Sequence, residues 1–214
     1  MSMMIKQVYK QQKFNLSGLS GISDQQLDIH FDLYAGYVKN TNLLNERIAD
    51  LIISGKTGSP QYTDIKRHLG FEHSGMRLHE YYFGNLTSES SDLEKGSKLS
   101  DQIAHSFGGY ENWKKDFVQV GLVRSVGWAI LFQDPITGNL SNHWITLHED
   151  GHPVGFQPIL VMDVWEHAFM VDYKPSDRAR YIEAFFSNIA WETVENRLIE
   201  PKADTPWYQK ALTA

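Results

Sequence analysis

The feature that most constrains the fold is a change of hydrophobic period about halfway along the chain. Over 27–53 and again over 62–86, apolar residues recur at helical spacing, so each stretch predicts one long helix. Further along, the pattern changes to short apolar runs at 128–132, 142–147 and 159–162, which predict strands. Long helices followed by a few strands are typical of an α+β fold.

A polar stretch separates the long helices from the rest of the chain. Residues 87–98, TSESSDLEKGSK, show no periodicity, which predicts a boundary between a helical domain at 1–90 and a second domain at 91–214. Shorter helices are expected directly after this boundary. Most of 165–198 is also expected to be helical, with a turn at Pro175.

Composition excludes several classes of function. The chain has no cysteine, so disulfides, thiol nucleophiles and iron–sulfur clusters are excluded, and any metal must be held by nitrogen and oxygen ligands. A net charge of -6 without a basic cluster argues against a nucleic-acid partner. The start of the chain lacks the apolar run of a secretion signal, and the longest apolar stretch, near 155–164, is too short to cross a membrane. We therefore expect a cytoplasmic protein without a membrane partner.

Three histidines and one aspartate are candidates for a metal site. Asp163 precedes His167 by four residues and directly follows an apolar run, so both side chains are expected where a strand leads into a helix. A helix cap plus a core histidine is the alternative at this point. His79 and His30 each lie on a helical stripe with aromatic residues, and a buried neutral imidazole needs a partner. Three imidazoles and one carboxylate suit iron or manganese.

Several ordered motifs resemble one family. Asp163-Val-Trp-Glu-His-Ala168 looks like the DxWEHA signature of the iron/manganese superoxide dismutases. Further similarities to family motifs occur in the same order along the chain, and the likeness extends from about residue 23 to 198. They are Tyr37-Val38 followed by Asn42, Phe107-Gly-Gly109 followed by Trp113 and Phe117, Ser125-Val-Gly-Trp128, and Ala190-Trp-Glu192.

The resemblance implies a fold and an activity. It implies an N-terminal long α-helical hairpin followed by an α/β domain with a three-stranded antiparallel sheet. One iron or manganese ion per subunit would lie between the two parts and would convert superoxide to dioxygen and hydrogen peroxide by redox cycling. By motif position the metal ligands are His30, His79, Asp163 and His167.

The resemblance also assigns roles around the metal. Tyr37 matches the active-site tyrosine, and Trp128 would form part of a dry wall around the ion. Arg178 resembles the arginine near the substrate entrance, where it would supply local positive charge for an anion despite the negative net charge.

The residue that hydrogen-bonds the solvent ligand of the metal departs from the family pattern. Family members usually use a glutamine, and at one of its two usual positions this chain has Gly75. At the other, in the strand region, His148 stands fifteen residues before Asp163 and is our candidate, with Glu149 as the competing alignment. Histidine in place of glutamine favours iron.

The spacing of two site residues and the substrate entrance at the dimer interface also depart from the family pattern. His30 precedes Tyr37 by seven residues, where the family usually has eight. Either family helices contain an inserted π-turn residue that this chain lacks, or the helix start is displaced and His30 ligates imperfectly. Family dimers usually have a gateway to the metal made of a histidine of one subunit and a tyrosine of the other, and here Met170 occupies the position of that tyrosine. Glu166, which bonds across the family dimer interface, is retained, so a homodimer with an altered substrate entrance is expected.

Two alternative functions remain open at this point. One is a non-catalytic metal-binding or structural protein of the same fold, which the altered gateway motivates. The other is a non-haem iron enzyme that uses the same ligands for oxygen chemistry, although we find no sequence sign of a cosubstrate pocket.

Overall fold

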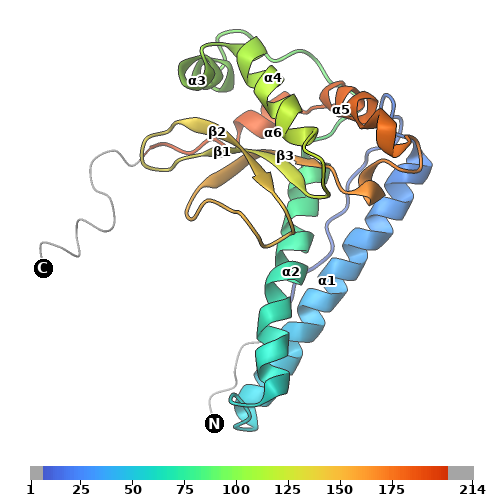
Figure 1. Ribbon diagram of the computed structural model, residues 1–214, viewed down its shortest axis with the longest axis vertical. Helices are drawn as coiled ribbons and strands as arrows, with labels where there is room; N and C mark the ends of the chain where they lie inside the picture. Colours follow the sequence, from blue (N-terminus) through green and yellow to red (C-terminus); the bar gives the residue numbers. More distant parts are fainter. Residues whose placement is uncertain (1–6, 202–214) are drawn as a thin grey trace, which may run out of the picture.

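The computed structural model describes residues 7–201, so the ends of both predicted domains, 1–6 and 202–214, lie outside the described residues. Two long helices are followed by two shorter ones, a three-stranded sheet and a helical C-terminal region (Figure 1). In chain order the elements are α1 Asp24–Ile53, α2 Pro60–Gly84, α3 Lys98–Phe107, α4 Tyr110–Gly121, β1 Trp128–Gln133, β2 Leu140–Ile145, β3 Gln157–Asp163, the 3₁₀ turns η1 Glu166–Ala168 and η2 Pro175–Asp177, α5 Arg178–Phe186 and α6 Trp191–Glu195.

The helices α1 and α2 form the predicted hairpin, which extends away from the sheet as a long arm (Figure 1). The side chain of Ser23 caps α1 by accepting a hydrogen bond from the Gln26 amide at 3.0 Å. Ser59 caps α2 in the same way, and Pro60 occupies the first turn, where its missing N–H costs nothing. Both helices therefore begin where the local sequence directs them to begin.

The sheet has the strand order β2-β1-β3, and both pairings are antiparallel. The central strand β1 is buried along its whole length, which explains why its sequence, WAILF, reads as a continuous apolar run. In the register of the sheet Trp128 is the partner of Asp163. The sheet thus places the predicted wall residue beside the predicted carboxylate ligand.

The expected α+β class and the three-stranded antiparallel sheet are confirmed, with small shifts of boundaries. The second strand lies at 140–145 instead of 142–147, because the turn after β1 closes early through the Asp134 N–H bond to the Asn139 carbonyl at 2.9 Å. Region 165–198 is less helical than expected. It contains two 3₁₀ turns before α5, and a loop between α5 and α6.

The polar stretch after α2 is attached to the C-terminal region. The Thr87 amide donates to the Asn188 carbonyl at 2.8 Å, and the Ser90 hydroxyl donates to the Ile189 carbonyl at 2.8 Å. The division into domains at residue 90 stays a prediction.

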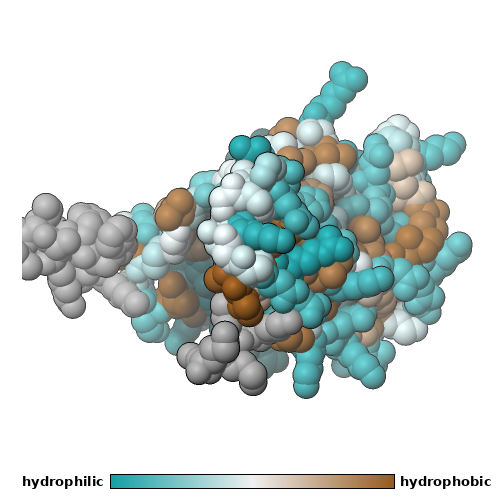
Figure 2. All heavy atoms as spheres, turned by 90° about the horizontal axis from the view of Figure 1, so that it is seen from below, coloured by the Kyte–Doolittle hydropathy of each residue, from teal (hydrophilic) through white to brown (hydrophobic). Residues whose placement is uncertain are grey.

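The hairpin end of the molecule has a mainly hydrophilic surface. Seen from below, polar side chains cover most of it, with a few hydrophobic groups between them (Figure 2). Ile53, at the end of α1, is among the exposed large hydrophobic residues. Among the helices in 7–201, none combines the length and apolar character needed to cross a membrane.

Candidate metal centre

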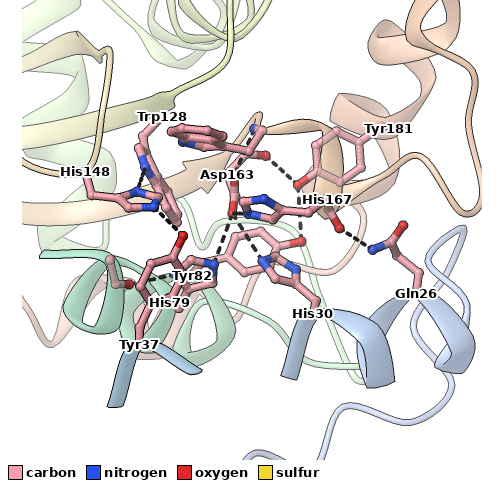
Figure 3. Close-up of polar contacts among 12 residues, drawn as sticks. Gln26, His30, Tyr37, His79, Tyr82, Trp128, His148, Asp163, His167 and Tyr181 are labelled. Carbon is pink, nitrogen blue, oxygen red and sulfur yellow. Dashed lines mark hydrogen bonds and ion pairs between the residues drawn. The ribbon is translucent and has the colours of Figure 1, made fainter. Parts of the chain in front are cut away.

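Four side chains from four different elements converge at the junction of the hairpin and the sheet (Figure 3). His30 comes from α1, His79 from α2, Asp163 from the end of β3 and His167 from η1. One nitrogen or oxygen atom from each lies within 4.8 Å of the others. The first three residues are buried and the His167 side chain is 22% exposed. The structure therefore brings together all four residues that the sequence predicts as ligands.

The two carboxylate oxygens of Asp163 have different partners. Oδ1 accepts the backbone N–H of Trp165 at 2.8 Å, which fixes the turn that leads into η1. Oδ2 lies 3.0 Å from His167 Nε2 and 3.2 Å from His30 Nε2. Asp163 thus fixes this turn and also takes part in the cluster, whereas the helix cap expected as the alternative is not formed, since η1 has no side-chain cap.

His79 presents an unpaired nitrogen to the cluster. Its Nδ1–H donates to the Gly75 carbonyl oxygen at 2.6 Å, which leaves Nε2 as the atom with a free lone pair. This Nε2 is buried, has no hydrogen-bond partner and lies 3.6 Å from Asp163 Oδ2. Burial and the nearby His30 hold the pKa of His79 well below its usual range, so the imidazole is neutral.

The charge pattern of the cluster fits a cation. Burial alone would raise the pKa of Asp163. The electrostatic attraction of His167 and His30 and the hydrogen bonds from them outweigh burial and hold the pKa of Asp163 well below its usual range. Beside this carboxylate, the buried Nε2 lone pair of the neutral His79 has no hydrogen-bond partner, which is costly. A metal ion with nitrogen and oxygen preference satisfies both groups, and this donor set suits iron or manganese.

The seven-residue spacing between His30 and Tyr37 places both side chains against His79. The ring centroids of His30 and His79 are 4.9 Å apart, and those of Tyr37 and His79 are 5.1 Å apart. The helix α1 is α-helical throughout 24–53, so no π-turn residue is inserted. In such a helix seven residues return to nearly the same face. Of the two sequence alternatives, the structure agrees with the missing π-turn residue.

His148 joins Tyr37 to Trp128. Trp128 Nε1–H donates to His148 Nδ1 at 3.1 Å, so Nδ1 must be an acceptor. Burial lowers the pKa of His148 to about 4, and the neutral ring therefore carries its proton on Nε2. That Nε2–H donates to the Tyr37 hydroxyl oxygen at 2.7 Å (Figure 3). The hydroxyl proton of Tyr37 is then free to be donated to another group.

Glu149, the competing candidate, points elsewhere. Its side chain lies against Gly70 of α2, 3.6 Å from where a Cβ would stand, and it lines a shallow surface depression with Asp64 and Arg67. His148 is buried, whereas Glu149 is only half-buried. Of the two residues, His148 is the one whose side chain reaches the cluster's surroundings.

Gly75 makes room for this arrangement. A Cβ added at Gly75 would stand 2.7 Å and 2.8 Å from two ring carbons of Tyr37 and 3.0 Å from His148 Cδ2. Such distances are below van der Waals contact, so any side chain here would displace both rings. The glutamine that family members can have at position 75 would therefore collide with the histidine at position 148.

Arg178 and Glu166 lie together at the surface. They line a depression of about 700 Å³ with Ser125. The guanidinium of Arg178 donates to the carbonyls of Val123 and Ser125, both at 2.9 Å. Both of these hydrogen bonds orient the guanidinium within the depression.

Two residues near the cluster are not among those that the sequence predicts. The Tyr181 hydroxyl donates to the Asp163 carbonyl at 2.7 Å and shares a 3.1 Å hydrogen bond with Tyr82. Tyr181 lies three residues after Arg178, the predicted entrance residue. The Gln26 side chain bonds the His167 carbonyl, and its position one turn before His30 was the one available signal.

Comparison with known proteins agrees with this geometry. Residues 94–197 match the family model described as iron/manganese superoxide dismutases, C-terminal domain. A superoxide dismutase [Fe] of Aquifex pyrophilus is 35% identical over 184 residues, which cover 84% of this chain and 85% of the relative. The chain belongs to the iron/manganese superoxide dismutase family. A manganese relative, superoxide dismutase [Mn] 2 of Haloferax volcanii, is also 35% identical, over 80% of this chain and 84% of its own length.

A further family relative is more distant. Superoxide dismutase [Fe] of Saccharolobus solfataricus is 31% identical over 83% of this chain and 85% of its own length. The part of the chain that matches the family model includes Trp128, His148, Asp163 and His167.

The buried imidazoles predict a pH-dependent stability of the metal-free protein. Burial lowers the pKa of His30, His79 and His148, while the unfolded chain takes up these protons near pH 6.5. The unfolded state therefore binds more protons below that pH, and the free energy of unfolding falls as the pH drops from about 6.5 toward 4. Each imidazole contributes a slope of about 1.4 kcal/mol per pH unit.

Denaturant unfolding of the metal-free protein between pH 7.5 and 5 measures this slope. His148→Gln should reduce it by about 1.4 kcal/mol per pH unit, whereas His105→Gln, at an exposed histidine, should leave it unchanged. An identical slope in wild type and His148→Gln would show that His148 is not buried in its neutral form.

Proposed function

We propose that the protein is a superoxide dismutase that binds one iron or manganese ion through His30, His79, Asp163 and His167. The observation that carries this proposal is the buried, unpaired Nε2 of His79 beside Asp163 Oδ2. Family membership supports the same activity. The ion supplies one-electron redox chemistry: an electron is taken from one superoxide, which leaves as dioxygen, and given to a second, which takes up two protons and leaves as hydrogen peroxide.

The protein's own residues hold the ligands and exclude water. The Asp163 carboxylate is fixed by the Trp165 amide, and the His79 ring by the Gly75 carbonyl. Trp128 is fully buried and its ring lies edge-on to His79 at 5.1 Å. This packing keeps the ligand side chains in one orientation and limits solvent around them.

Tyr37 holds a proton for the second half of the reaction. Burial and the charge of Asp163 raise the pKa of Tyr37, so its hydroxyl stays protonated. The oxygen of that hydroxyl accepts from His148, which leaves its O–H to be donated toward the cluster. In this proposal His148, and not Glu149, occupies the position from which family members hydrogen-bond the solvent ligand of the metal.

Replacing His148 with alanine tests its role. Without the imidazole the Tyr37 hydroxyl loses its donor and Trp128 loses its acceptor, so activity should fall about 10–100-fold, as for other residues that support a metal site. The midpoint potential of the bound metal should also shift. His105→Ala at an exposed site is the matched control. Unchanged activity and unchanged potential in His148→Ala would remove this residue from the mechanism.

Metal reconstitution tests the function itself. The metal-free protein is loaded anaerobically with iron or with manganese, and superoxide consumption is followed for each form. We expect activity with one bound ion per chain, higher with iron because a histidine stands at position 148. A protein that binds either ion but consumes no superoxide would instead be a non-catalytic metal-binding member of the fold.

We also propose a homodimer in which Glu166 reaches the partner subunit's His167. Glu166 is exposed, the His167 side chain is 22% exposed, and Leu122 and Met170 nearby leave 37% and 46% of their surfaces exposed. Glu166 and Leu122 line the same depression. Exposed apolar side chains around a carboxylate are suited to a contact between two copies.

Sedimentation tests the dimer. The protein should sediment as a dimer at micromolar concentration, and Glu166→Arg should weaken dimerisation at least about 10-fold because a positive charge replaces the interfacial acceptor. Glu111→Arg, at an exposed site on α4, is the control. A wild-type monomer with full activity would show that Glu166 does not have this role.

The cytoplasmic location stays a prediction from the sequence.

A further inference from the structure

Gln26 is a buried amide whose two polar ends both contact the loop after His167. It lies on α1 one turn before His30 and is 1% exposed. Its Nε2 donates to the His167 carbonyl oxygen at 2.6 Å (Figure 3). Its Oε1 accepts the backbone N–H of Val171 at 3.0 Å. The side chain thus fills both hydrogen-bonding roles of an amide against two separate backbone groups.

The two backbone groups are the pair that would bond each other in a helix. A carbonyl and an N–H four residues apart close an α-helical turn, and His167 and Val171 have this spacing. The preceding pair is closed directly, since the Met170 amide donates to the Glu166 carbonyl at 2.9 Å. For the next pair, His167 and Val171, the side-chain amide of Gln26 bonds both groups in place of a direct hydrogen bond between them. A side chain from α1 therefore completes a turn that the loop leaves open.

This contact connects two of the four ligands. Gln26 shares α1 with His30, and its partner carbonyl belongs to His167, whose ring centroid is 5.0 Å from that of His30. The start of α1 is also joined to this loop by the Ser23 amide, which donates to Asp172 Oδ2 at 2.8 Å. That bond lies outside the turn, so it attaches the loop without fixing the His167 backbone.

We propose that Gln26 is a positioning residue that sets the retention of the metal by fixing His167 relative to His30. The inference rests on the proposed function, because it concerns the ion held by these ligands. Its physical basis is the pairing of one planar, buried amide with two backbone groups of a partly buried turn. An apolar side chain at position 26 leaves both groups unpaired, and the turn must rearrange to find other partners. His167 moves with that turn.

The test compares metal release from iron-loaded variants in excess chelator. Gln26→Met keeps the length and burial of the side chain but removes both hydrogen bonds, and it should release iron about 10–100-fold faster than wild type. Hydrogen exchange of the segment 166–173 in the same protein should also accelerate, while exchange in β1 stays unchanged. Gln26→Asn keeps the amide but shortens its reach by one methylene group. It provides a second variant for the same two measurements, iron release and hydrogen exchange, if Gln26→Met folds poorly.

Two controls separate positioning from general stability. Gln25→Met alters the exposed neighbour on α1 and should leave both readouts unchanged. Val194→Ala, at a buried site on α6, lowers stability away from the cluster and should not accelerate iron release. The inference is overturned if both Gln26 variants keep iron as wild type does, or if Val194→Ala releases it as fast. Wild-type protein that binds neither iron nor manganese would instead refute the proposed function, and the inference with it.

Discussion

Replacing Asp163 with asparagine should abolish stable metal binding and reduce superoxide consumption at least about 100-fold, beyond the loss expected for a residue that only supports a ligand. Asparagine has nearly the same shape and can still accept the Trp165 N–H through its oxygen, so the turn after β3 is retained. What is lost is the single negative charge among three imidazoles, the group that attracts and neutralises a cation.

Metal content by elemental analysis and activity after anaerobic loading measure this effect. Asp28→Asn is the matched control, because Asp28 is exposed on the same helix as His30 and takes no part in the cluster. Asp163→Asn protein that retained one ion per chain with normal activity would show that Asp163 is not a ligand.

The second large effect is expected at Gly75. Gly75→Ala places a methyl group 2.7–2.8 Å from the Tyr37 ring and 3.0 Å from His148, and both rings are packed on their other sides. Overpacking of this kind costs about 1–3 kcal/mol of stability. Because the rings must separate, the 2.7 Å bond between His148 and Tyr37 should be lost, and activity should fall about 10-fold or more.

A glycine on the same helix provides the control. Gly70→Ala adds its methyl group 3.6 Å from the nearest atom, an ordinary contact, and removes a helix-interior glycine, so it should stabilise the protein by about 0.5–1 kcal/mol without loss of activity. Thermal unfolding and superoxide consumption of both variants decide the matter. Equal behaviour of Gly75→Ala and Gly70→Ala would mean that the site does not depend on the space at Gly75.

The four residues of the cluster could be named from the sequence chiefly because Asp163-Val-Trp-Glu-His-Ala168 resembles a family signature. His30 and His79 lie on long helices whose buried faces follow from periodicity. Asp163 and His167 lie where an apolar run ends, and helix and strand periods are fixed by backbone geometry. The four residues lie together as the sequence predicts, and their role as metal ligands stays a prediction.

The surroundings of the ligands could not be predicted in the same way. Whether His148 or Glu149 faces inward depends on the conformation of the loop between β2 and β3, which no periodicity encodes. Gln26 contacts a carbonyl 141 positions away in the chain, and its position one turn before His30 predicts that it lies on the buried face of α1 but not which group it contacts. Such contacts are set by how the elements pack, and so they emerge only from the folded arrangement.

The most direct test of the account is the position of the metal in crystals of the iron-loaded protein, located by anomalous scattering at the iron edge. We expect one peak per chain, in contact with Nε2 of the three histidines and Oδ2 of Asp163. A peak at any other place, or no peak in fully loaded and active protein, would contradict the assignment of the metal centre.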